Sequence, residues 1–265
     1  MIYQSLTRSF SLAFAVLALL LCSFVAANAD TVYWTDWTGS NTGQVVGQFV
    51  GNGTITTTTS TVNVTYTNTN GIGFYQASGG TDWWVPRSPV SNSPYTSTAV
   101  DNPPTGADII GLRYAGNQTL SFSQAIANPM FSYVSLNGNG YAFLNQDFNI
   151  LSYGAGLGAA APGDNSCGYW GCGTSYKNVV DLGNGNTEYQ LLGTGEPHGT
   201  IQFTGSFDTL TWRSLSNEYW NGFTVGVQGT SAEIFPPSNV PEPASLLLLG
   251  TGLGVLGLTA WRRRK

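Results

Sequence analysis

Apolar and polar residues alternate along several short stretches in the middle of the chain. Leu120 and Phe122 alternate with polar neighbours between Thr119 and Ser123. The same pattern recurs at Ile201 and Phe203, at Leu210 and Trp212, and at Phe223, Val225 and Val227. A period of two is typical of strands that bury one face, and no long stretch between the two ends of the chain has helical periodicity. The pattern therefore predicts an all-β body.

Residues that tolerate positive φ separate these stretches. They occur at Gly51-Asn52-Gly53, Asn137-Gly138-Asn139-Gly140 and Asn184-Gly185-Asn186, and each predicts a turn. Around the second turn we expect a hairpin of residues 130–136 and 141–151. Many short antiparallel strands favour a two-sheet sandwich of jelly-roll-like architecture. A parallel β-helix is the alternative, but the chain has no fixed repeat period.

The two ends differ from the body. Residues 1–29 have a positive Arg8, an apolar run over 10–24 and a small-residue Ala27-Asn28-Ala29 site, which predicts a signal peptide that also removes Cys22. At the other end, an uncharged run from Ser245 to Trp261 is just long enough for one transmembrane helix. We therefore expect a body at 30–228 with a proline-rich loop at 86–106, a linker at 229–239 and a sorting signal at 240–265.

The C-terminal segment resembles the PEP-CTERM sorting signal of Gram-negative bacteria that produce exopolysaccharide. The matching features are Pro241, Glu242 and Pro243, the apolar segment, and the basic residues Arg262, Arg263, Arg264 and Lys265. The resemblance implies a precursor anchored in the inner membrane and cut near the motif by an exosortase-type membrane protease. The same tail is also named after ice-binding proteins that carry it. An ordinary single-pass anchor is the alternative.

The charge of the body limits its partners. Five of the nine Lys and Arg residues belong to the two terminal signals, which leaves four cations against thirteen Asp and Glu, or a net charge of about 4 − 13 = −9. Nucleic acid needs a basic surface, so it is excluded as a partner. An acidic charge is typical of a protein that stays soluble outside the cell or binds cations.

Candidate chemistry is sparse. Cys167 and Cys172 are the cysteines of the body, and in an oxidising compartment we expect them to form a disulfide. His198 is the one histidine, with Glu188 or Glu196 as a partner if it were a general base. No nucleophile or second histidine accompanies it, so we assign no catalytic residue and no metal. The alternative for His198 is a polar turn before a strand, and replacement by alanine should leave function unchanged apart from a modest loss of stability.

Three aromatic pairs stand beside turn residues. They are Trp83-Trp84, Tyr169-Trp170 and Tyr219-Trp220. Because successive side chains of a strand point to opposite faces, one ring of each pair is expected to be exposed. Flat exposed rings suit the apolar faces of sugars, so these six residues are the candidate ligand-binding aromatics. The alternative is that the rings fill the core.

Two further patterns favour binding over catalysis. Residues 54–69 read as one strand with Val62, Val64 and Tyr66 on one face and a row of threonines on the other. Threonine arrays on flat sheets resemble ice-binding surfaces, although threonine also serves an ordinary solvated face. Asp30, Asp36, Asn217 and Glu218 carry oxygen atoms of the kind that bind Ca²⁺, without EF-hand spacing.

Taken together, the sequence predicts a non-enzymatic exported protein of the cell surface or the exopolysaccharide matrix. The alternatives are a carbohydrate- or ice-binding module and a secreted glycan hydrolase. Exposed coplanar aromatics would favour sugar binding, several rows of threonine on a flat face would favour ice, and two carboxylates facing across a cleft would favour hydrolysis.

Overall fold

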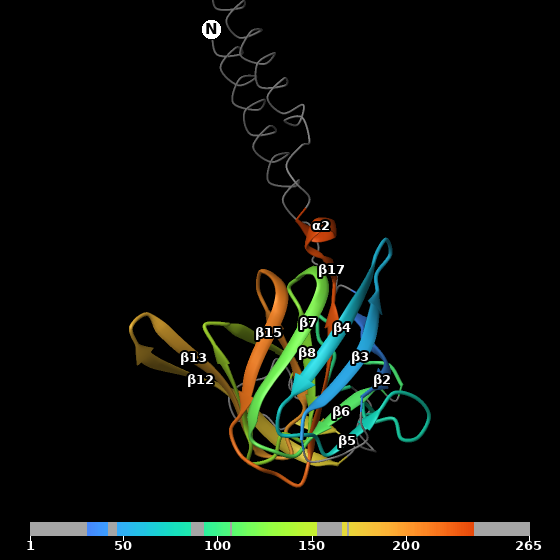
Figure 1. Cartoon of the computed structure of the whole chain (residues 1–265). Coiled ribbons are helices and arrows are strands. Elements are labelled where there is room, and N and C mark those ends of the chain that lie inside the picture. The colour runs from blue at the N-terminus through green and yellow to red at the C-terminus, as the bar shows by residue number, and fades with distance from the viewer. Residues whose placement is uncertain are drawn as a thin grey trace, which may run out of the picture.

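The computed structural model describes residues 31–41, 47–85, 93–106, 108–152, 166–168 and 170–235. Strands in this part of the chain form two antiparallel sheets, and its one helix is the single turn α2 (Ser231–Ile234) (Figure 1). The predicted all-β, two-sheet class is confirmed. No described helix is long and apolar enough to cross a membrane. The predicted signal peptide and transmembrane helix lie outside the described residues.

The smaller sheet has seven strands among the described residues. In spatial order they are β10 (Phe148–Ser152), β14 (Gly199–Phe203), β8 (Met130–Val134), β16 (Asn221–Val227), β6 (Ile109–Leu112) and β5 (Phe74–Gln76), with β1 (Tyr33–Trp34) also paired to β16. All seven residues of β16 are buried. This strand is therefore covered on both faces.

The larger sheet has ten strands in the described part of the chain. In spatial order they are β11 (Ser166–Gly168), β12 (Gly171–Gly183), β13 (Asn186–Gly195), β9 (Gly140–Leu144), β15 (Ser206–Ser214), β7 (Gly116–Ala127), β4 (Thr61–Asn68), β3 (Phe49–Thr56) and β2 (Asp36–Ser40), with β17 (Gly229–Thr230) also paired to β7. The alternation predicted for residues 119–123 and 210–212 is confirmed, because β7 and β15 bury every second side chain there.

Aromatic rings from both sheets meet in the core. Phe131 of β8 stacks on Phe223 of β16 with centroids 4.9 Å apart, and Trp212 of β15 and Tyr66 of β4 approach Phe223 at 5.1 and 5.2 Å. Ring pairs at these distances add about 0.5–1.5 kcal/mol each beyond the area they bury. The residues of the buried clusters all lie between 32 and 227. We therefore expect residues 30–235 to fold without the terminal segments.

The predicted long loop covers the outer face of the smaller sheet. Within its described part, Tyr95 and Val100 are fully buried, and Tyr95 packs with Trp84, Ile109 and Val134. This cover explains why β16, at the centre of the sheet, buries both of its faces. The loop is thus part of the core.

One predicted hairpin and one predicted turn are wrong. Residues 130–136 and 141–151 do not form a hairpin, because β8 belongs to the smaller sheet and β9 to the larger one; the turn at residues 137–140 carries the chain across the sandwich. Gly51-Asn52-Gly53 lies inside β3. A Cβ atom at Gly53 would lie 2.7 Å from the Asp36 carbonyl oxygen, so this glycine is required by close packing against β2.

Other predictions are refined. Residues 54–69 belong to two strands, β3 and β4, joined by a turn, while Val62, Val64 and Tyr66 are buried as expected. Asn184 and Gly185 have φ of 53° and 78° and form the predicted tight turn, between β12 and β13. The predicted linker begins with ordered structure, since β17 and α2 occupy residues 229–234 and pack on β7.

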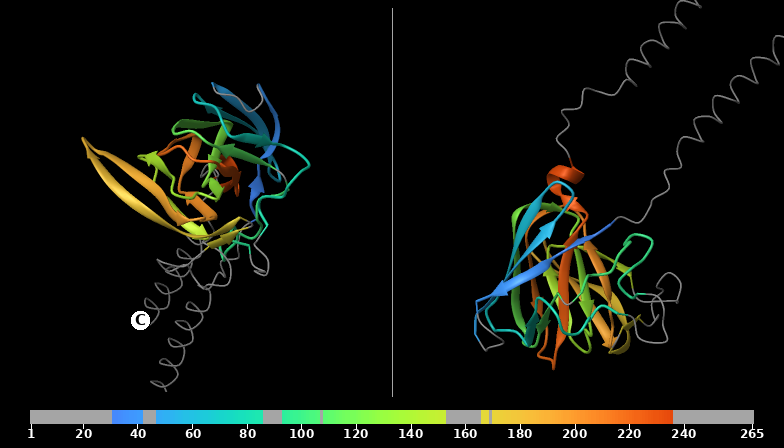
Figure 2. Two further views of the ribbon diagram at one scale, coloured as in Figure 1. Left: turned by 90° about the horizontal axis from the view of Figure 1, so that it is seen from below. Right: turned by 90° about the vertical axis from the view of Figure 1, so that its right-hand side faces the viewer.

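Both described ends of the body lie at one end of the sandwich. Tyr33 pairs with Val227, and β17 and α2 follow directly after β16. Figure 1 and Figure 2 show α2 at this end and β5 and β6 towards the other end. A seven-residue strand spans about 20 Å, so the start of β16 at Asn221 lies roughly that far from the end that carries α2.

The role of Gly53 gives a stability prediction. Gly53→Ala should lower the free energy of unfolding by about 1–3 kcal/mol, the usual cost of overpacking, because its Cβ would also lie 2.7 Å from Thr35 Cγ2. Gly39→Ala is the matched control on β2, where no atom lies within 4 Å of the added Cβ. Urea unfolding of residues 30–235 measures both, and equal midpoints for the two variants would refute this explanation.

Candidate functional site

Three of the predicted aromatic residues meet at the end of the sandwich opposite α2. The ring centroids of Trp83 and Trp170 are 5.5 Å apart and stacked, and Trp220 lies edge-on at 5.1 Å from Trp83 and 5.8 Å from Trp170. Phe74 of β5 approaches Trp83 at 5.0 Å and Trp220 at 5.4 Å. We call Trp83, Trp170, Trp220 and Phe74 the tryptophan cluster.

The smaller sheet positions two members of the cluster. Phe74 pairs with Gly111 of β6, which in turn pairs with Gly222 of β16, and Trp220 stands two residues before Gly222. A Cβ at Gly111 would lie 2.3 Å from the Phe74 ring. The absence of a side chain at Gly111 therefore leaves the space that this ring occupies.

Trp83 stands beside a tryptophan that is fixed in the core. Asp82 Oδ1 accepts a hydrogen bond from the Trp84 backbone N–H at 2.9 Å, and Trp84 Nε1 donates to the Asp108 carbonyl at 3.2 Å. Trp84 is thereby fixed in the core and Trp83 is half-buried. Tyr219 is exposed and Trp220 half-buried. The expectation of one exposed ring in a pair is met by Tyr219 and by Trp170, whereas Trp83 is half-buried rather than exposed, and Tyr169 lies outside the described residues.

Trp170 contributes the most exposed ring of the cluster, at 44%. It stands in the turn between β11 and β12, where Cys167 lies directly opposite Cys172. Directly opposed residues in antiparallel strands have Cα atoms about 4.5–5.5 Å apart, which is within the range of a disulfide. The register therefore supports the predicted disulfide, and the bond itself stays a prediction.

His198 ties this turn to the body. The imidazole is fully buried, with Nδ1 accepting from the Ser135 backbone N–H at 3.2 Å and Nε2 lying 3.2 Å from the Gly171 carbonyl oxygen. This pattern places the single proton of a neutral ring on Nε2. Burial lowers the pKa of His198 to about 4, partly offset by the bond to Gly171. His198 stands, as expected, in the bend that precedes β14, and its ring is buried there. The alanine variant would remove the partner of the Ser135 N–H and of the Gly171 carbonyl, which costs stability.

Two carboxylates lie beside the cluster. Ser135 Oγ donates to Glu196, and a Cβ at Gly171, next to Trp170, would lie 2.7 Å from Glu196 Cγ. Glu218, two residues before Trp220, accepts from the side-chain amides of Asn137 and Asn221. Burial, with a smaller contribution from the charge of Glu196, raises the pKa of Glu218 to about 6. Sequence reasoning did not connect these residues, because they come from three separate loops.

The other predicted residues do not join this site. Glu188 forms an ion pair with Arg213 at 3.0 Å on the larger sheet, so it does not orient His198. Asp36 belongs to β2, and Asn217 accepts from the Ala115 backbone N–H at 2.8 Å. No group of three or more metal-binding residues occurs among the described residues. The suggested Ca²⁺ ligands are therefore not assembled, and Asp30 is not described.

The outer face of the larger sheet carries several rows of hydroxyl and amide side chains. In register across β3, β4, β7 and β15, one row is Asn52, Thr65, Ser121 and Thr209. The next row is Val50, Thr67, Thr119 and Thr211. The single row expected from the sequence is thus extended by neighbouring strands. The spacings of a sheet are about 4.8 Å between strands and 6.7 Å between alternate residues.

Comparison with known families finds the PEP-CTERM protein-sorting motif at residues 239–265. The chain carries a PEP-CTERM sorting signal. The match contains Pro241, Glu242, Pro243 and the terminal basic residues, all outside the described structure. No curated protein and no solved structure matches the chain. The motif indicates that the chain is an exported, membrane-anchored precursor that an exosortase, a membrane protease-like enzyme, then processes.

The single histidine allows a direct test of its buried, neutral state. The unfolded chain binds this proton below about pH 6.5 and the folded chain only below about 4, so the contribution of His198 to the free energy of unfolding should fall by roughly 3 kcal/mol as the pH drops through this window. Asp108 and Glu218, whose pKa values burial raises to about 6, contribute with the opposite sign, so the imidazole itself has to be observed. NMR of residues 30–235, prepared without a histidine tag, should show an imidazole that titrates near pH 4 and near 6.5 once unfolded in urea. A midpoint near 6.5 in the folded protein would contradict the burial argument.

Proposed function

We propose that this PEP-CTERM protein is a non-enzymatic component of the cell surface or the exopolysaccharide matrix, and that it binds neutral glycan through the tryptophan cluster. The observation that carries the proposal is the convergence of Trp83, Trp170 and Trp220 from three distant segments into one partly exposed group. A cluster needed only for packing would be expected in the core, where Trp84 and Trp212 lie. Exposed rings provide contact area to sugars with little loss of side-chain entropy.

The position of the cluster supports this function. Trp220 precedes β16, and β17 and α2 follow its far end, so the strand separates the cluster from the segment that leads to the sorting signal. A protein attached through its C-terminal end would present the cluster away from the attachment point. Glu196 and Glu218 add hydrogen-bond acceptors beside the rings, and such acceptors could orient sugar hydroxyls.

Charge favours a neutral ligand. The body has a net charge of about 4 − 13 = −9, and an anionic polysaccharide would be repelled unless cations bridged the two. We therefore expect binding of neutral glycans without Ca²⁺ and of acidic glycans only when Ca²⁺ is supplied.

A substitution in the cluster tests the proposal. Trp170→Ala should weaken binding to a neutral polysaccharide about tenfold, equivalent to 1.4 kcal/mol, and leave the melting temperature nearly unchanged because the ring is 44% exposed. Phe235→Ala, a 50% exposed aromatic at the opposite end, is the control. Affinity electrophoresis of residues 30–235 against a panel of polysaccharides provides the measurement.

The remaining outcomes distinguish the alternatives. Equal binding by the Trp170 and Phe235 variants, or no binding to any polysaccharide, would reject the glycan proposal. New reducing ends in the polysaccharide, lost in Glu218→Gln, would instead identify the protein as a glycan hydrolase, since Glu218 has the raised pKa expected of a general acid.

The hydroxyl rows of the larger sheet favour ice binding as a second candidate function. The outward residues of β3, β4 and β7 in these rows carry no charge, and their spacing repeats in two directions. Inhibition of ice recrystallisation by residues 30–235 measures this activity directly. Thr119→Lys, in the middle of the array, should abolish the inhibition and Trp170→Ala should not. Absence of inhibition in the unaltered protein would exclude this function.

A further inference from the structure

The outer edge of β12 lacks a strand partner along most of its length. β11 pairs only with Gly171, Cys172 and Gly173, and from Thr174 to Gly183 no described strand lies beside this edge. Figure 1 and Figure 2 show the β12–β13 hairpin projecting from the side of the sandwich. The backbone groups on such an edge can pair with another strand.

This edge carries large apolar side chains. Tyr176, Val179 and Leu182 are between 47% and 54% exposed. Natural edge strands are usually protected by charged side chains or proline, and residues 174–183 contain no proline and two charges, Lys177 and Asp181. Three large exposed apolar residues on a strand whose outer edge is open indicate an interaction surface.

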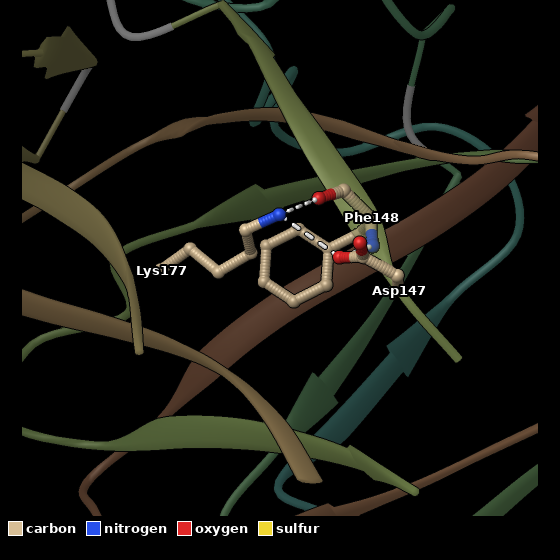
Figure 3. Close-up of polar contacts among 3 residues, drawn as sticks. All are labelled: Asp147, Phe148 and Lys177. Atoms are coloured by element: carbon tan, nitrogen blue, oxygen red, sulfur yellow. Dashed lines mark hydrogen bonds and ion pairs between the residues drawn. The ribbon is translucent and has the colours of Figure 1, made fainter. Parts of the chain in front are cut away.

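Lys177 braces the hairpin against the body. Figure 3 shows its Nζ bound to Asp147 Oδ1 and to the Phe148 carbonyl oxygen, both at 2.9 Å, and it also lies over the rings of Phe148 and Tyr189 at 5.6 and 6.0 Å. These contacts hold β12 in a defined position. The two hydrogen bonds use two of the three ammonium protons of Lys177. The third proton is left for a carboxylate on a strand that pairs with the outer edge of β12.

We propose that β12 pairs antiparallel with β12 of a second copy of the chain, with Val179 on the two-fold axis. In this register Lys177 faces Asp181 of the second copy, and Asn178 faces Val180. Symmetry produces each of these pairs twice. Opposite charges therefore face each other on both sides of the axis, and Val179 meets Val179 of the second copy at its centre.

The neighbouring registers are less favourable. If Asn178 lay on the axis, Lys177 would face Val179 and Asp181 would face Ser175. If Val180 lay there, Lys177 would face Gly183 and Asp181 would face Val179. In both registers neither Lys177 nor Asp181 faces an opposite charge of the second copy. The β-bulge between Asp181 and Gly183 contains Leu182, so regular pairing with the second copy covers Lys177 to Asp181. The self-complementarity of one register is the reason for choosing a second copy as the partner rather than an unrelated strand.

Sedimentation velocity over a concentration series tests the dimer. Residues 30–235 should form dimers reversibly, and Val179→Lys and Asp181→Lys should each raise the dissociation constant at least tenfold by placing like charges opposite one another. Leu144→Lys is the matched control, an equally exposed residue on β9, which is paired on both sides. A monomer at all concentrations, or dimers that persist in both lysine variants, would overturn the proposal.

Cross-linking tests the register. Val179→Cys should form a disulfide with itself in the second copy under mild oxidation, because only this residue lies on the axis. Asn178→Cys, the adjacent exposed residue, should cross-link much more slowly. Equal cross-linking, or faster cross-linking at residue 178, would show that the proposed pairing is wrong. Neither residue belongs to the tryptophan cluster, so a failure here leaves the glycan proposal intact.

Discussion

The buried, neutral imidazole of His198 is the interaction on which the candidate site depends. It joins the backbone of Ser135 to that of Gly171, and these residues belong to segments far apart in the sequence. Gly171 follows Trp170, and the Ser135 hydroxyl holds Glu196. An uncompensated charge on this buried ring would be costly, so burial lowers the pKa of His198. The same buried position allows the neutral ring to contact both Ser135 and Gly171.

The sandwich supplies the rest of the arrangement. Aromatic residues from both sheets pack around Phe223 in the centre of the molecule. Phe223 belongs to β16, and Trp220 directly precedes this strand. Because the loop at 93–106 covers the outer face of the smaller sheet, Trp84 and Tyr95 form a second buried layer against which Trp83 is positioned. The cluster is thus built at the rim of a rigid core, where its rings are held and still partly exposed.

The sequence predicted local features better than long-range ones. Alternation identified β7, β15 and the buried face of β4, and Asn184-Gly185 identified its hairpin, because these signals depend on neighbouring residues. Gly51-Asn52-Gly53 gave a false turn, since the requirement for glycine at residue 53 comes from contact with Asp36 and Thr35. The strands flanking residues 137–140 were assigned to one hairpin because local patterns do not show that a chain crosses between sheets.

In the candidate site, too, the local features were predictable from the sequence and the long-range contacts were not. Each aromatic pair was recognised from the sequence, but the meeting of Trp83, Trp170 and Trp220 depends on the order of strands in the smaller sheet and on the β11–β12 turn. The raised pKa of Glu218 likewise depends on burial and on Glu196. No spacing along the chain encodes these contacts.

The most direct test of the account is ¹⁹F NMR of residues 30–235 labelled with fluorotryptophan, recorded as a neutral oligosaccharide is added. The body contains seven tryptophans, the eight of the chain less Trp261, and single substitutions assign their signals. Binding at the proposed site should shift the signals of Trp83, Trp170 and Trp220 and leave those of Trp37 and Trp212, which are buried in the main core, in place. Saturable binding that leaves all three cluster signals unshifted would contradict the account.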